Sequence, residues 1–153
     1  MSGKKYLIIV GGPTASGKTG LAIRLARHYK TEILSADSRQ FFKEMTIGTA
    51  KPSREERLKV PHHLVNHISI HQKYNVGDFE REALQLLEQL YEKHDVVILA
   101  GGSGLYIKAL CEGLDQFPEV PEQIRMEIEQ LYQHEGIKAL QEALKINDPD
   151  YHA

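Results

Sequence analysis

The sequence offers little for cross-links or membrane insertion. It has one cysteine, Cys111, and no tryptophan. A single thiol excludes an internal disulfide framework and a zinc site built on cysteines. The longest strongly apolar runs, Leu7–Val10 and Val96–Ala100, are far shorter than the roughly 20 residues that a membrane helix needs. We therefore expect a protein of the reducing cytoplasm with no membrane segment.

The composition is that of a folded chain. Its 153 residues are 41% hydrophobic and 26% charged, which suits about one domain with a substantial core. The net charge of −2 hides an asymmetry, because residues 1–63 carry 12 Lys/Arg against 5 Asp/Glu and the remainder is acidic. A basic N-terminal part attracts phosphates or nucleic acid, and an unevenly solvated surface is the plainer explanation. Charge alone leaves both open.

Short apolar runs alternate with amphipathic segments over the first two thirds of the chain. We expect strands at 6–10, 33–36 and 95–100, and helices at 18–29, 78–93 and 105–112. Residues 39–63 have no sustained period and predict a long, partly structured loop. This alternation predicts an α/β fold in which helices flank a parallel sheet.

Two prolines, Pro118 and Pro121, separate this part from an acidic helical end. Beyond them we expect helices at about 122–134 and 136–146, broken at Gly136. The expected domains are therefore an α/β core over 1–117 and a helical segment over 118–153.

The first glycine cluster matches G-x-x-x-x-G-K-[ST] between a predicted strand and a predicted helix, as a phosphate-binding P-loop requires. Its backbone N–H groups and the helix N-terminus can hold a polyphosphate. Lys18 would contact the outer phosphates, and the Thr19 hydroxyl would ligate Mg²⁺. The motif does not say which polyphosphate binds. Its residues are Gly12, Pro13, Thr14, Ala15, Ser16, Gly17, Lys18 and Thr19.

Asp37 follows the strand predicted at 33–36. Residues just past the carboxyl ends of such strands face the ligand crevice, so Asp37 is a candidate to face the bound phosphate, with a plain capping role as the alternative. The strand at 95–100 ends in Gly101 rather than in an acid. The Gly101–Gly104 segment is either a tight turn or a presentation of the Ser103 hydroxyl to substrate.

A group of histidines begins at the end of the predicted loop: His62, His63, His67 and His71. Adjacent histidines on an extended chain point in opposite directions, and Ile68-Ser69-Ile70 alternates too strictly for the helix that an i, i+4 ligand pair needs. We expect polar or RNA-facing histidines rather than a zinc site.

Five motifs follow one another along the chain: Gly12–Thr19, Asp37–Gln40, Ile47–Pro52, Val60–Leu64 and Gly101–Tyr106. In their order and rough spacing they resemble those of the tRNA dimethylallyltransferases (tRNA isopentenyltransferases). The resemblance covers essentially the whole chain and implies a P-loop NTPase-like core with the start of a helical insertion. Members are about twice as long, so we expect an N-terminal half that is inactive alone.

The resemblance implies a reaction: transfer of a dimethylallyl group from dimethylallyl diphosphate to N6 of the adenine at tRNA position 37. Asp37 would then be the base, Lys18 and Mg²⁺ would stabilise the leaving pyrophosphate, and Ser103 would lie near both substrates. A monomer acting on tRNA is expected. The implied tRNA contacts are Asp37, Ser38, Arg39, Gln40, Ser103 and Arg125.

Two other enzymes remain as alternatives. Adenylate isopentenyltransferases are similar but typically have Lys in place of Ser38 and Asn in place of Ala50. A small-molecule P-loop kinase would need an arginine-bearing lid, and 105–135 offers only Arg125. The chain departs from many tRNA-modifying members at Phe42, Glu44 and Thr46, which are loop positions.

Overall fold

The protein consists of two compact units, Met1–Leu114 and Asp115–Ala153. The computed structural model describes residues 3–114 and 120–152. The boundary expected near residue 117 lies outside the described residues.

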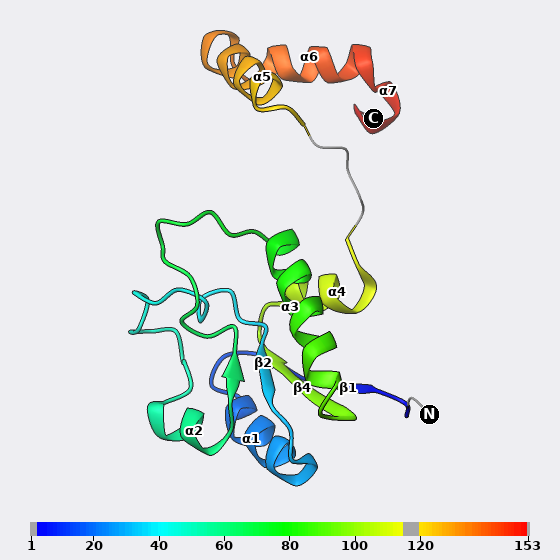
Figure 1. Ribbon diagram of the computed structural model, residues 1–153. Coiled ribbons are helices and arrows are strands. Elements are labelled where there is room, and N and C mark those ends of the chain that lie inside the picture. Colours follow the sequence, from blue (N-terminus) through cyan, green and yellow to red (C-terminus); the bar gives the residue numbers. More distant parts are fainter. Residues whose placement is uncertain (1–2, 115–119, 153) are drawn as a thin grey trace. The chain divides into compact units, whose positions relative to one another are not determined.

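The first unit is built on a parallel sheet (Figure 1). The strand order is β1-β4-β2-β3, so β4 lies between β1 and β2 although it comes last in the sequence. Its residues pair with both neighbours, as Ile98 does with Ile8 and Ile33. The strands are β1 (Tyr6–Gly11), β2 (Ile33–Ser35), β3 (His62–His63) and β4 (Val96–Gly101).

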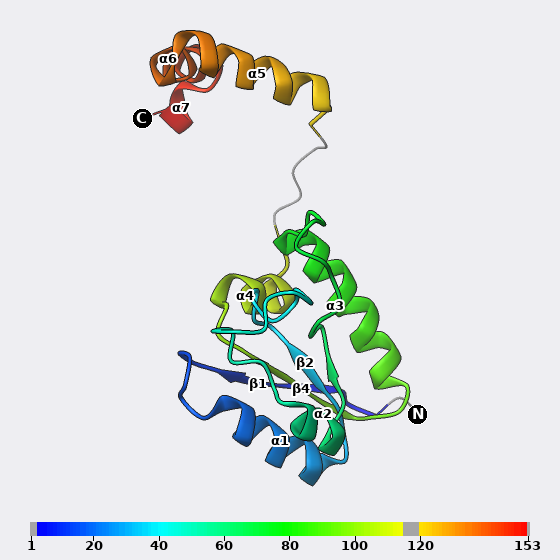
Figure 2. The same cartoon turned by 90° about the vertical axis from the view of Figure 1, so that its left-hand side faces the viewer.

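Helices lie on both faces of this sheet, with α1 on one side and α3 on the other (Figure 2). Two apolar cores result. Ile98 packs with α1 residues such as Ala22, whereas Val97 and Leu99 pack with α3. Because both faces of β4 are buried, the strand is apolar throughout, as is usual for a parallel sheet. The helices are α1 (Lys18–Tyr29), α2 (Arg54–Lys59), α3 (Val76–Tyr91) and α4 (Gly104–Glu112).

The predicted strands and helices are confirmed to within two residues, and α1 has the predicted bounds. The start of α3, two residues before the predicted one, has a physical cause. The Asn75 side chain accepts from the N–H of Asp78 at 3.1 Å, and the Asp78 carboxylate accepts from the N–H of Asn75 at 2.9 Å. This reciprocal pair satisfies two backbone donors that a helix start leaves without partners.

The partly structured loop predicted over 39–63 contains two elements that were not predicted, α2 and β3. A six-residue helix and a two-residue strand are too short to show a period. A local signal for α2 was nevertheless present. Ser53 and Glu56 form a capping box, in which Glu56 N–H donates to Ser53 Oγ at 3.1 Å. The sheet therefore has four strands in the described part of the chain instead of the three expected.

The second unit is helical, as expected. A turn at Gly136, with φ 75°, separates its first two helices. None of the described residues in 120–152 is buried, and apolar side chains such as Ile146 and Tyr151 are exposed. The helices are α5 (Glu122–Glu135), α6 (Ile137–Asn147) and α7 (Pro149–His152).

No helix within residues 3–114 and 120–152 combines the length and the apolar character that crossing a membrane requires.

Candidate active site

The P-loop lies between β1 and α1. Gly12 and Gly17 have φ of 152° and 83°, which glycine adopts at little cost. Ser16 N–H donates to the carbonyl oxygen of Pro13 at 3.4 Å and closes a turn. Gly17 caps α1 without a side-chain hydrogen bond, so the first N–H groups of the helix are open to an anion. The Lys18 ammonium donates to the Pro13 carbonyl across the loop.

Asp37 begins a turn just beyond β2. Ala36 N–H still donates to Ala100 on β4 at 2.8 Å, and the ladder ends there. The Asp37 carboxylate accepts two hydrogen bonds from its own turn. Arg39 N–H donates to Oδ1 at 3.1 Å, and the Gln40 side chain donates to Oδ2 at 3.4 Å. The carboxylate is therefore held at the carboxyl edge of the sheet, as predicted from its place just past the end of a strand.

The turn after β4 contacts the turn after β2. A Cβ at Gly101 would lie 2.2 Å from the Ala36 carbonyl oxygen, so only glycine fits there. Ser103 N–H donates to the same oxygen at 3.2 Å. Ser103 Oγ accepts from Ser38 N–H at 3.0 Å and donates to Ser38 Oγ at 3.3 Å. The Ser103 hydroxyl thus orients the residue next to Asp37.

A cavity of about 290 Å³ opens beside the P-loop. Lys18 and Thr19 line it together with Asp37, which comes from another turn. Apolar side chains form much of its remaining wall. The lining residues are Thr14, Ala15, Gly17, Lys18, Thr19, Ala22, Ile33, Ser35, Asp37, Gln40, Ala50, Pro52, His62, Ala100 and Gly101.

A second cavity, of about 430 Å³, shares two lining residues with the first, Thr14 and Asp37. Its wall is more polar and includes the Ser103 and Ser38 pair. The lining residues are Pro13, Thr14, Asp37, Ser38, Arg39, Gly48, Thr49, Gly102 and Ser103.

The two adjacent histidines diverge, as expected for an extended chain. His63 Nε2 lies 2.6 Å from Glu32 Oε2, away from the P-loop. His62 lines the first cavity, and its Nδ1 donates to the Val60 carbonyl oxygen at 2.8 Å. Burial lowers the pKa of His62, so this wall of the cavity is neutral at pH 7. Sequence reasoning did not place His62 in the cavity.

The cavities are also lined by Gly48, Thr49, Ala50 and Pro52, to which sequence reasoning assigned no role. Thr49 is buried and donates from Oγ1 to the Met45 carbonyl oxygen at 3.0 Å, which closes its own loop. Ala50 has φ 47°, a conformation in which its backbone turns toward Gln40. The motif over 47–52 was the available signal, but a motif does not show which cavity its residues line.

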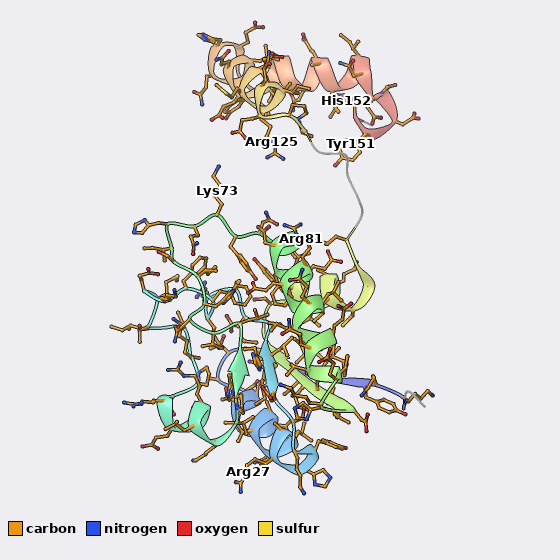
Figure 3. All side chains as sticks on the ribbon, viewed as in Figure 1. Arg27, Lys73, Arg81, Arg125, Tyr151 and His152 are labelled. Atoms are coloured by element: carbon orange, nitrogen blue, oxygen red, sulfur yellow. The ribbon has the colours of Figure 1, made fainter. Side chains whose placement is uncertain are left out.

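The described part of the chain holds no group of three His, Cys, Asp or Glu side chains arranged to bind a metal ion. Thr19 and Asp37 are oxygen-bearing side chains that share the first cavity. Arg125 lies on α5 in the second unit and is exposed (Figure 3). Its contact with tRNA stays a prediction.

The parallel sheet, the loop between β1 and α1 and the helices on both faces define a P-loop α/β protein. A family model described as IPP transferase matches residues 40–153. The chain belongs to this family, in agreement with the resemblance seen in the motifs.

Curated relatives of the chain are named as tRNA dimethylallyltransferases, the family that the motifs resemble. The chain is 55% identical over 148 residues to the tRNA dimethylallyltransferase of Flavobacterium johnsoniae, with 97% of this chain and 48% of the relative covered. The chain spans about half the length of the curated relatives it matches.

Solved structures of similar fold are also prenyl transferases described as acting on tRNA. The full-length tRNA isopentenylpyrophosphate transferase from Bacillus halodurans is 34% identical, with a TM-score of 0.70 over 98% of this chain and 50% of that one. A eukaryotic dimethylallyltransferase described as acting on tRNA is 25% identical, with a TM-score of 0.82 over 97% of this chain and 37% of that one.

Proposed function

We propose that the natural protein that contains this chain transfers a dimethylallyl group from dimethylallyl diphosphate to N6 of the adenine at tRNA position 37 and releases pyrophosphate. The observation that supports this most is the pair of cavities that meet at Thr14 and Asp37. Two substrates held in neighbouring cavities can react only where these cavities meet. The names of the relatives support the same reaction.

The chemistry of the walls assigns each substrate to a cavity. The first cavity combines the cation of Lys18 and the helix N-terminus with apolar surface from Ala22 and Ile33, which suits a diphosphate with a short hydrocarbon chain. The second is lined by hydroxyls and backbone groups, including Ser38, Thr49 and Ser103, which suits the polar edge of a purine. The transferred carbon and the amine then meet beside Asp37.

Each bond change has a residue beside it. The N6 amine is a weak nucleophile, because its lone pair is delocalised into the purine ring. Asp37 accepts the N6 proton while N6 bonds to the allylic carbon. The carbon–oxygen bond of the donor breaks, and its electron pair leaves on pyrophosphate. The N–H groups of the P-loop and Lys18 stabilise that charge.

Mg²⁺ fits the donor set of the first cavity. It prefers oxygen ligands and is often held by one or two protein oxygens together with substrate phosphates. The Thr19 hydroxyl would hold it, with Asp37 lining the same cavity. A bound Mg²⁺ would supply charge stabilisation to the diphosphate.

The tRNA is proposed to contact the turn Asp37–Gln40 with Ser103, and Arg125 of the second unit. Arg39 is exposed on this turn and lines the second cavity. The target base lies in a single-stranded loop and leaves its stack to enter a pocket, as in other enzymes that modify bases. Arg27 projects to solvent from the last turn of α1 and is one of the basic side chains of residues 1–63 (Figure 3).

We also propose a monomer that acts in the cytoplasm. Residues of one chain form both cavities, so the site needs no second copy. Cys111 is an exposed free thiol, as is usual where thiols stay reduced.

The test is prenyl transfer by the natural protein with Mg²⁺ and labelled dimethylallyl diphosphate. Three acceptors are offered separately: unmodified tRNA, the same tRNA with guanine at position 37, and AMP. We expect transfer to the first alone. Transfer to AMP but not to tRNA would place the protein with the adenylate isopentenyltransferases. Transfer to the guanine-substituted tRNA would refute the choice of position 37.

A further inference from the structure

The Gln40 side chain faces inward, although it belongs to the turn that the family resemblance assigns to tRNA. Its Nε2 donates toward three acceptors: Asp37 Oδ2 at 3.4 Å, the Thr49 carbonyl oxygen at 3.4 Å and the Ala50 carbonyl oxygen at 3.1 Å. One amide nitrogen thus joins the carboxylate to the loop that lines both cavities.

Ser35 contacts the other end of the same amide. It is the last residue of β2, its side chain is buried, and its Oγ donates to Gln40 Oε1 at 3.1 Å. Both Ser35 and Gln40 line the first cavity. Ser35 therefore occupies the rigid end of a strand, whereas Gln40 and Asp37 belong to the turn that follows it.

The hydrogen bond from Ser35 selects one orientation of the amide. With Oε1 toward Ser35, the two N–H bonds point at the carboxylate and the carbonyls. Turning the amide by 180° would place its oxygen against three acceptors and its NH₂ group against the Ser35 hydroxyl. Acceptor against acceptor is repulsive, and a polar group left without a partner in a partly buried place is costly.

We propose that Ser35 and Gln40 are positioning residues for Asp37: Ser35 orients the Gln40 amide, and that amide sets the plane of the carboxylate. Arg39 N–H holds Oδ1 and Gln40 holds Oδ2, so both oxygens are fixed. A base that must meet an amine at one angle gains rate from such preorganisation. The inference rests on the proposed function, because it concerns the base of that reaction.

A double-mutant cycle in the natural protein tests whether Ser35 acts through Gln40. Gln40→Met keeps the length of the side chain and removes both donors, and we expect kcat to fall ~10-fold, less than loss of the base itself. Ser35→Ala should lower kcat ~5-fold. If Ser35 acts through Gln40, the double variant should lose no more than Gln40→Met alone. A loss of kcat close to the product of the two single losses, ~50-fold, would overturn the inference.

The KM values separate positioning from binding. We expect KM for tRNA and for dimethylallyl diphosphate to stay within ~2-fold in all three variants, because the Gln40 side chain acts on the base and leaves only the backbone of residue 40 to contact tRNA. A rise in KM for tRNA with kcat unchanged would show that Gln40 binds tRNA and would overturn the inference.

Two further variants exclude a purely structural effect. Ser35→Thr keeps the hydroxyl that Ser35→Ala removes, so its kcat should stay within ~2-fold of the wild-type value. Thr31→Val removes a hydroxyl that is equally buried beside β2 but donates to Val96, away from both cavities. It should destabilise the fold as Ser35→Ala does and leave kcat unchanged. Equal loss of kcat in Thr31→Val would overturn the inference.

A spectroscopic readout separates this inference from the proposed function. The side-chain amide of Gln40 is assigned by ¹⁵N-glutamine labelling and by its loss in Gln40→Met. Its protons should exchange slowly in the wild type and quickly in Ser35→Ala. Unchanged exchange would refute the Ser35 contact. If the wild type modifies no tRNA while this result holds, the proposed function fails and the contact between Ser35 and Gln40 stands.

Discussion

Thr14 of the P-loop and Asp37 beyond β2 form the wall that both cavities share. One follows β1 and the other follows β2, two strands that β4 separates in the sheet. They meet because the carboxyl ends of parallel strands lie at one edge of the sheet. The phosphate loop and the candidate base are thereby brought to a single point.

In the natural protein that contains this chain, Lys18→Ala should abolish turnover and leave the fold intact. Lys18 is on the P-loop and lines the first cavity, so we expect it to contact ligand rather than core. Removing a cation from a transferring diphosphate costs about 3 kcal/mol or more of transition-state stabilisation. Turnover and circular dichroism check this, with Lys93→Ala on the exposed surface as the control. Near-normal turnover in a folded Lys18→Ala variant would remove Lys18 from the mechanism.

Asp37→Asn keeps the size of the side chain but cannot accept a proton. We expect the rate to fall ~10²–10⁴-fold, as for loss of a general base, and tRNA binding to weaken much less. Single-turnover rates and tRNA titrations measure the two effects separately. If both fall by the same factor, Asp37 positions tRNA and is not the base.

Gly101→Ala should destabilise the first unit by about 1–3 kcal/mol, the usual cost of overpacking. The new Cβ would lie 2.2 Å from the Ala36 carbonyl oxygen, which belongs to backbone and cannot move aside easily. Gly104→Ala is the matched control, because no atom lies within 4 Å of its Cβ. Denaturant unfolding compares the two. Equal stability of the two variants would show that the turn after β4 can shift enough to accommodate the added Cβ.

The protein should become less stable as the pH falls from 7.5 to 5.5. Burial lowers the pKa of both His62 and His67 in the folded chain, with Glu82 opposing the effect at His67. The unfolded chain therefore binds protons first, and stability is lost as the pH falls below the ordinary histidine value of 6.5. Denaturant unfolding at the two pH values measures this.

His67→Phe should reduce that pH dependence. The ring packs against Phe41 and Tyr74, with centroids 5.4 and 5.3 Å away, so phenylalanine suits the site. His28→Gln, on the exposed surface of α1, serves as the control and should keep the full dependence. An unchanged slope in His67→Phe would assign the effect to His62 or to other groups.

The 153-residue chain should bind pyrophosphate and should not turn over tRNA. The anion site is local to β1, the P-loop and α1, whereas orienting an adenine over Asp37 needs contacts around the whole tRNA. Calorimetry with pyrophosphate and Mg²⁺, with Lys18→Ala as the control, tests the first part. A prenyl-transfer assay tests the second. Turnover near that of the full-length relatives would contradict this division.

The sequence by itself determined the elements whose causes are local. The P-loop is eight consecutive residues between a strand and a helix. The start of α3 depends on Asn75 and Asp78, three residues apart. The apolar run of β4 follows from burial on both faces. Such causes act within one turn or one strand, so a sequence pattern shows them.

Tertiary structure alone decided how the turns combine into a site. Ser103 orients Ser38 across 65 positions of sequence, and no periodicity relates them. Gln40 turns inward only because Ser35 and the carbonyl oxygens of residues 49 and 50 surround its amide. β3, with two residues, exists because β2 offers it a hydrogen-bonding edge. These outcomes depend on which groups meet after folding, and the partners lie too far apart in the chain for local pattern to specify them.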